Sequence, residues 1–214
     1  MCIRDRNKRF NAGLNLKYRR VRNEPLPSDA IKVFTGGDPS FFRHGLTGIG
    51  PQIRYAPTAA LPNFSIQSSF IFPIGDELEG RDGGPFIDWN GPIWTTQFFN
   101  DISIGSNFSF FTELDLIIED IGKSEDGFLN RVSTPVTLIF SYNPNPKTTV
   151  YALTGYSPFW QSSFDYFAQA GVGTKYQFTR NVELELLYTY FTTRSFQQNG
   201  GNAGTYNVGF RYNL

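Results

Sequence analysis

Hydrophobic and polar residues alternate along most of the chain with a period of two, the pattern of β-strands that have one apolar and one polar face. The C-terminal residues show it clearly. One face carries Tyr206, Val208, Phe210, Tyr212 and Leu214, and the other carries Asn207, Gly209, Arg211 and Asn213. The alternation predicts an extended chain that presents two chemically different surfaces.

The same pattern predicts ten strands. Their ranges are 9 to 21, 45 to 56, 63 to 74, 93 to 104, 108 to 119, 132 to 142, 148 to 157, 165 to 178, 182 to 194 and 204 to 214. The registers of the fourth and seventh strands stay open. A soluble strand has about 5 to 6 residues, whereas a tilted membrane strand needs about 9 to 11. The strand lengths therefore favour a membrane over a soluble barrel or sandwich, the alternative that alternation also allows.

Short and long connections follow each other in strict alternation. The short turns are 57 to 62, 105 to 107, 143 to 147 and 179 to 181, and the long loops are 22 to 44, 75 to 92, 120 to 131, 158 to 164 and 195 to 203. Bacterial barrels keep short turns on the periplasmic side and long loops outside. With ten strands, both termini are expected in the periplasm.

The chain resembles small outer-membrane β-barrel proteins of Gram-negative bacteria over nearly all of residues 9 to 214. Aromatic residues third and fifth from the end and an apolar last residue (Tyr212, Phe210 and Leu214) are similar to the family's assembly signal, although the family usually ends in Phe. The Asn- and aromatic-rich composition resembles proteins of the Bacteroidetes group. The resemblance implies an all-β, antiparallel up-and-down transmembrane barrel in one domain, which contacts outer-membrane lipid, lipopolysaccharide and the barrel-assembly machinery.

Composition agrees with this fold. Aromatic residues make up 17% of the chain and glycine occurs 21 times, which favours β-structure. Lys plus Arg and Asp plus Glu number 19 each, so no nucleic-acid partner is expected. No stretch reaches the roughly 18 to 20 apolar residues of a spanning helix, but barrel strands escape that test because only alternate residues face lipid.

The first six residues lack the apolar region of a signal peptide. They resemble translated sequencing-adaptor sequence, so residues 1 to 8 are predicted to be an artefact or a disordered start. An even number of strands would then be missing, and twelve strands is the alternative to ten. Apart from Cys2 the chain has no cysteine, and neither metal nor cofactor is expected.

Charged residues on the polar faces of the strands are predicted to form a network in the barrel lumen. They are Lys17, Arg19, Arg54, Glu113, Asp115, Lys175, Glu183, Glu185 and Arg211. Adjacent strands should bring opposite charges together, with Arg211 and Lys175 beside the carboxylates of the strand from 182 to 194. Such pairs either brace a narrow lumen or screen small solutes.

The opposite faces are predicted to contact the membrane. Their residues are Phe10, Leu14, Leu16, Phe64, Ile66, Phe70, Phe72, Val172, Leu184, Leu186, Val208 and Phe210. The same alternation predicts that these side chains point outward into acyl chains.

The function expected from this sequence is an envelope scaffold or a narrow passive pore. One alternative is a protein whose outer loops bind glycan through Trp89, Trp94 and Trp160, or lipopolysaccharide through cations shared with acidic residues of loop 75 to 92. Solvated surface is the simpler expectation for those acidic residues. Another alternative is an outer-membrane hydrolase that uses His44, but no motif fixes a catalytic geometry there, so no enzyme activity is expected.

Overall fold

The computed structural model describes residues 2–3, 9–22, 42–58, 61, 63–75, 77–80, 85–122, 131–161, 163–194 and 203–212. Its strands are β1 (Cys2–Ile3), β2 (Phe10–Arg22), β3 (Phe42–Tyr55), β4 (Phe64–Pro73), β5 (Ile93–Ile104), β6 (Phe108–Glu119), β7 (Arg131–Ser133), β8 (Val136–Asn145), β9 (Thr148–Trp160), β10 (Phe164–Gln177), β11 (Val182–Thr193) and β12 (Ala203–Tyr212). Each of the ten predicted strands overlaps the long strands of this set. The predicted all-β fold is confirmed.

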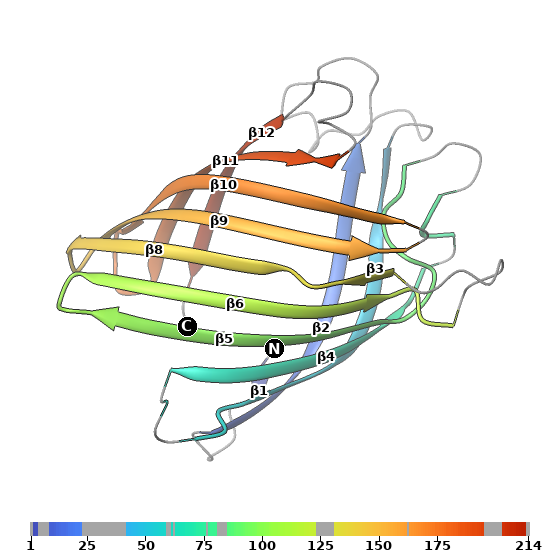
Figure 1. Cartoon of the computed structure of the whole chain (residues 1–214), viewed down its shortest axis with the longest axis horizontal. Helices are drawn as coiled ribbons and strands as arrows, with labels where there is room; N and C mark the ends of the chain where they lie inside the picture. Colours follow the sequence, from blue (N-terminus) through green and yellow to red (C-terminus); the bar gives the residue numbers. More distant parts are fainter. Residues whose placement is uncertain are drawn as a thin grey trace. The chain divides into compact units, whose positions relative to one another are not determined.

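The strands form an antiparallel, up-and-down sheet. Strands that follow each other along the chain are generally hydrogen-bonded neighbours, and β8 pairs with both β6 and β9. Figure 1 shows β8, β9, β10 and β11 side by side in this order. In the described part of the chain, no helix has the length and apolar character needed to cross a membrane.

The structure corrects the predicted strand from 132 to 142, which is divided into β7 and β8. Thr134 and Pro135 separate the two pieces. Proline has no backbone N–H and cannot donate to a ladder, so regular pairing is interrupted there. The carbonyl of Pro135 still accepts a hydrogen bond from the backbone N–H of Asp115 at 2.8 Å.

At the start of the chain, β1 pairs with β2 through Cys2 opposite Gly13 and Ile3 opposite Ala12. The adaptor origin of this segment stays a prediction.

The chain divides into two compact units. The first contains Met1–Tyr55, Gln67–Thr96 and Ile117–Arg131, and the second contains Ala56–Ile66, Gln97–Leu116 and Val132–Leu214. Each is described by itself.

The first unit is built around the β2–β3 hairpin. Its register runs from Phe10 opposite Tyr55 to Arg22 opposite Phe42, with a shift between Lys17 and Tyr18. Thr47 is the extra residue on β3, is 1% exposed, and donates its hydroxyl to the Lys17 carbonyl at 3.3 Å. This bulge re-aims the side chains beyond it, which matters for the site described below.

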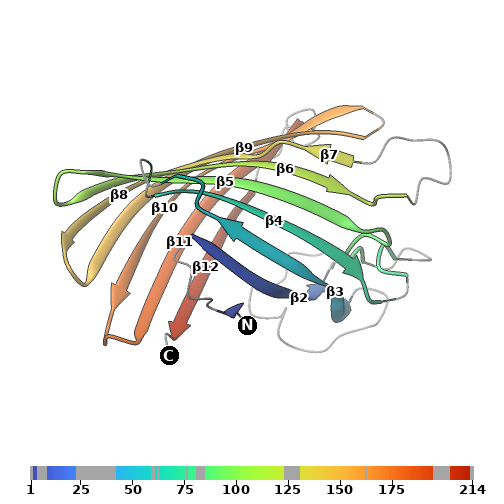
Figure 2. The same cartoon turned by 90° about the horizontal axis from the view of Figure 1, so that it is seen from below.

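The second unit contains the strand succession from β8 to β12, and Figure 2 shows β10, β11 and β12 running side by side at its end. Lys175 of β10 stands opposite Glu185 of β11, and Glu183 of β11 stands opposite Arg211 of β12. Directly opposed residues share a face, so register alone brings these charges together.

The distribution of apolar and polar side chains is the reverse of that in a soluble domain. Large apolar side chains are exposed on the long strands, for example Leu16 at 63% and Val172 at 61%. Small polar residues are buried instead, among them Thr47, Ser65, Ser69, Ser133 and Thr189. A soluble barrel or sandwich would bury the apolar face instead, so this pattern argues against that alternative.

Close packing on the polar face of the second unit depends on a glycine. Gly173 of β10 lies opposite Tyr151 of β9, and a Cβ at Gly173 would fall 2.4 Å from the Tyr151 ring. The ring is 6% exposed and its hydroxyl donates to Glu185. Glycine therefore makes room for an aromatic side chain that spans from β9 to β11.

We expect Gly173→Ala to lower the free energy of unfolding by about 1 to 3 kcal/mol, because the added methyl group displaces the Tyr151 ring. Urea unfolding in detergent micelles measures the change. Gly45→Ala is the matched control, since a Cβ there meets nothing within 4 Å. In a Tyr151→Ala background the Gly173→Ala cost should disappear, and an undiminished cost would show that the ring is not its cause.

Candidate functional site

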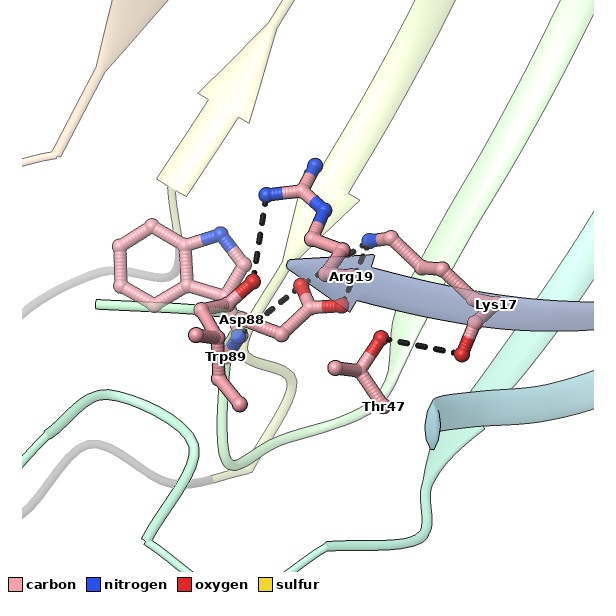
Figure 3. A network of polar contacts seen from close by, with 6 residues as sticks. Lys17, Arg19, Thr47, Asp88 and Trp89 are labelled. Carbon is pink, nitrogen blue, oxygen red and sulfur yellow. Dashed lines mark hydrogen bonds and ion pairs between the residues drawn. The ribbon is translucent and has the colours of Figure 1, made fainter. Parts of the chain in front are cut away.

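Cations on one face of the β2–β3 hairpin hold the loop that connects β4 and β5. The Lys17 ammonium lies 2.8 Å from Asp88 Oδ2 and 2.9 Å from Oδ1, so it bridges both carboxylate oxygens. Figure 3 shows this pair together with Thr47, whose hydroxyl reaches the Lys17 carbonyl. The Asp88 side chain is 4% exposed and that of Lys17 is 25% exposed, so the ion pair is largely removed from solvent.

Two arginines of the hairpin bind the backbone of the same loop. Arg19 donates to the Ile87 carbonyl at 3.3 Å. Arg43 donates to three carbonyls of the loop, which belong to Glu77 at 2.8 Å, Pro85 at 3.0 Å and Leu78 at 3.4 Å. The five guanidinium N–H donors allow one arginine to satisfy several carbonyls at once.

The loop also has an internal hydrogen-bonded core. The Leu78 carbonyl accepts from Ile87 N at 2.9 Å and from Asp88 N at 3.2 Å, and Leu78 N donates to Asn90 Oδ1 at 2.8 Å. Leu78 is 2% exposed and Ile87 is 4% exposed. Buried apolar side chains and satisfied backbone groups together give the described part of this loop, residues 77–80 and 85–92, a defined conformation.

The environment of Asp88 keeps its carboxylate ionised. Burial alone would raise the pKa of Asp88, but hydrogen bonds from Lys17, Thr47 and the Trp89 backbone, with the Lys17 charge, hold this pKa below its ordinary value. The ion pair is therefore complete at neutral pH.

The expectation that loop 75 to 92 is solvated acidic surface is wrong for Asp88, which is buried and paired. Asp76 and Asp82 lie outside the described residues. Of the three tryptophans expected to form a sugar-binding surface, Trp89 and Trp94 have separate partners, and glycan binding stays a prediction. Trp89 lies beneath the Arg131 guanidinium at 5.7 Å and Trp94 Nε1 donates to Ser68 at 3.0 Å.

In the second unit, opposite charges meet across neighbouring strands. Lys175 Nζ lies 3.6 Å from Glu185 Oε1, and Arg211 Nη1 lies 3.5 Å from Glu183 Oε1. Lys175 also lies 5.4 Å from the centre of the Tyr151 ring. The resulting cluster joins β9, β10, β11 and β12 through side chains as well as through the backbone.

The remaining residues of the predicted charge network have other surroundings. Gln97 donates to Glu113 Oε1 at 2.7 Å, and Asp115 lies two residues further along the same face of β6. Arg54 lies opposite Asn11 near the end of β3 and is exposed. The structure thus brings Lys175, Glu183, Glu185 and Arg211 together, but it pairs Lys17 and Arg19 with a loop. Their position in a lumen stays a prediction.

The residues predicted to contact lipid differ in exposure. Phe10, Leu14, Leu16, Phe72, Val172, Leu186, Val208 and Phe210 are exposed. Phe64, Ile66, Phe70 and Leu184 are half-buried. Of the predicted assembly signal, Phe210 is 71% exposed and Tyr212 ends β12, whereas Leu214 lies outside the described residues. The assembly role stays a prediction.

His44, the candidate for hydrolysis, lies in an aromatic setting. Its Nδ1 is 3.0 Å from the Tyr18 hydroxyl and its ring is 5.3 Å from that of Phe42. The loop residues Asp38 and Ser40 lie outside the described residues. The described contacts of His44 therefore supply neither the carboxylate nor the serine that a hydrolase needs.

Sequence reasoning missed Arg43 and gave Thr47 no role. Residues 22 to 44 were predicted to be a loop, but β3 begins at Phe42. The signal was present, because Phe42, His44 and Leu46 continue the alternation of β3 toward the N-terminus and leave Arg43 on the polar face. Nothing in the sequence pattern indicates that Arg43 contacts loop carbonyls.

We expect Asp88→Asn to lower the free energy of unfolding at pH 7 by about 1 to 3 kcal/mol, because Lys17 loses its counter-charge in a partly buried site. The folded-state pKa of Asp88 lies below the unfolded-state value of about 3.9, so the pair's contribution is present above that value and is lost as pH falls through the folded-state pKa. Denaturant unfolding at pH 7 and at about pH 2 tests this.

The difference between Asp88→Asn and the parent should shrink in acid. The exposed carboxylate Asp101 supplies the control, since Asp101→Asn should change stability by less than about 0.5 kcal/mol. A difference that stays the same at both pH values would contradict an ionic origin.

Comparison with known proteins gives a likeness of fold. No family model and no curated protein matches the chain. Among solved structures, it is similar to OmpTdeltaL8, a loop L8 deletion mutant of OmpT, an outer membrane protein of Vibrio cholerae. The TM-score is 0.51 at 10% identity, and the match covers 96% of this chain and 76% of that chain. At this identity the likeness concerns the fold alone: the chain has the strand architecture of an outer-membrane β-barrel protein.

Proposed function

We propose that this chain is an integral outer-membrane barrel that serves as an envelope scaffold, with its exposed apolar face toward lipid and its polar face enclosed. The separation of the two faces carries the proposal. On β11, Leu186 is 47% exposed, whereas Glu183 and Glu185 on the other face hold ion pairs. The fold likeness supports the same setting. We infer that both termini lie in the periplasm, because the connections alternate in length from β2 to β9. The predicted long loop 158 to 164 departs from this alternation, since only residues 161 to 163 separate β9 from β10.

A scaffold fits the polar face better than a wide pore does. Lys17 pairs with Asp88, Lys175 with Glu185 and Arg211 with Glu183, while Arg43 binds loop carbonyls. A selectivity filter acts on passing ions through charged side chains that can contact those ions. The charged side chains named here contact other groups of the protein instead. We therefore assign the network a bracing role, and the proposal includes no catalytic role.

Lipid contact is tested with single cysteines at Leu186 and Leu187, after the one cysteine of the sequence is removed by Cys2→Ser. The two positions match in residue type and depth, but they lie on opposite faces of β11. We expect a fluorophore at Leu186→Cys to be quenched by a quencher in the acyl chains, and one at Leu187→Cys to be quenched less. Fluorescence in reconstituted vesicles measures both.

Equal quenching at the two positions, or stronger quenching at Leu187→Cys, would refute the assignment of faces. Quenching of both labels only by water-soluble iodide would refute membrane insertion itself. Single cysteines at Asn207 and Val208 repeat the comparison on β12, where Val208 is 73% exposed.

Planar-bilayer recording tests the scaffold role. We expect the reconstituted parent to give no resolved ohmic openings, because the polar face is occupied by paired charges and an anchored loop. Asp88→Asn, which weakens the contact between Lys17 and the loop, should give a larger conductance than the parent. Stable openings of the parent in physiological salt would refute the scaffold and favour the narrow pore.

A further inference from the structure

The type of side chain on the exposed face of the β2–β3 hairpin changes from one end of the hairpin to the other. Phe10 and Tyr55 stand opposite each other at one end, followed by aliphatic rows such as Leu16 opposite Ile49. Tyr18 then stands opposite Leu46, and Arg20 opposite His44. The segment from Phe10 to Tyr18 matches the about 9 to 11 residues that a tilted strand needs to cross a membrane. The row of Arg20 and His44 therefore begins where the apolar band ends.

Four side chains at the end of the apolar band form one connected cluster. The Arg20 guanidinium lies 4.7 Å from the centre of the Phe42 ring, and the rings of Phe42 and His44 are 5.3 Å apart. His44 Nδ1 lies 3.0 Å from the Tyr18 hydroxyl. The Arg20 guanidinium and the His44 ring thus pack near the Phe42 ring, and the Tyr18 hydroxyl lies beside His44. This arrangement limits the rotamer freedom that binding would otherwise remove.

A cleft of about 460 Å³ adjoins the cluster, within the same unit. It is lined by Phe42, Arg43, His44, Gly45, Leu46, Gly75, Leu78 and Ile87. Leu46 is 54% exposed and extends the apolar surface toward this cleft. The surface therefore combines a positive charge, hydrogen-bonding groups and an apolar floor.

The charge and position of the cluster identify its partner. The chain between β2 and β3 belongs to the long connections, which lie outside the cell in bacterial barrels. The outer leaflet there contains lipid A, a glycolipid with phosphate monoesters above its acyl chains. Arginine recognises phosphate through paired N–H donors, and aliphatic side chains below it suit acyl chains.

We propose that Arg20, His44 and Tyr18 form a docking surface for a phosphate group of lipid A. Leu16 and Leu46 contact its acyl chains below. This inference rests on the proposed outer-membrane setting and adds a specific lipid and the residues that bind it. The lipid is held at the rim of the hairpin. There Arg20, His44 and Tyr18 lie on the face opposite Lys17 and Arg19, beside a cleft that residues of the anchored loop also line.

Fluorescence anisotropy of labelled lipid A with the full chain in detergent micelles tests the proposal. We expect Arg20→Gln to weaken binding about tenfold, the loss of one charge-assisted hydrogen bond. Chemically dephosphorylated lipid A should bind the parent about tenfold more weakly as well, for the same reason. Arg180→Gln is the matched control, because Arg180 is an exposed arginine in a short turn, and it should bind like the parent.

Folding of each variant is checked by the heat-dependent electrophoretic mobility of the intact barrel. If Arg20→Gln does not fold, His44→Phe replaces it, because this change retains ring packing and removes the hydrogen bond to Tyr18. Unchanged affinity in a folded variant, or equal binding of dephosphorylated lipid A, overturns the proposal. Equal binding of phosphatidylglycerol overturns the choice of lipid A. Failure of the Leu186 and Leu187 quenching comparison would instead refute the membrane setting.

Discussion

The antiparallel hydrogen-bond ladder is the interaction on which the rest of this structure depends. A strand in hydrocarbon has no water to satisfy its backbone groups, so each N–H and C=O must pair with a neighbouring strand. The long strands β9 to β12 do this in continuous register. Once the backbone is satisfied in the sheet, side chains alone determine the chemical character of each face, and the period of two separates apolar from polar residues.

Confining polar residues to one face creates a second requirement, because charges brought together there need partners. The second unit meets it through register, which sets Lys175 against Glu185 and Glu183 against Arg211. The first unit meets it with a loop, since Lys17 binds Asp88 and Arg43 binds carbonyls. Both solutions stabilise the sheet through contacts that are absent from its hydrogen-bond ladder.

The sequence predicts those features that depend on neighbouring residues. Alternation located the ten long strands, and register followed for the β11 and β12 charges. Features that depend on distant residues were not predictable: nothing near Asp88 indicates that Lys17, 71 residues away, is its partner. Pro135 was a local signal for the break between β7 and β8, but the strand prediction passed over it. The space that Gly173 leaves for Tyr151 required the three-dimensional packing.

Arg43 holds the loop between β4 and β5 through backbone carbonyls rather than through side chains. This determines how the loop responds to substitution. Arg43 binds carbonyls, which any residue supplies, so their convergence depends on the path of the loop. Two residues with left-handed backbone, Glu77 with φ 55° and Gly80 with φ 88°, shape that path. The left-handed conformation strains the backbone of Glu77, which is not a glycine. The contacts of Arg43 and the burial of Leu78 offset this strain. The loop conformation and the cationic face that holds it are therefore mutually dependent: without Arg43 the turn at Glu77 loses its support.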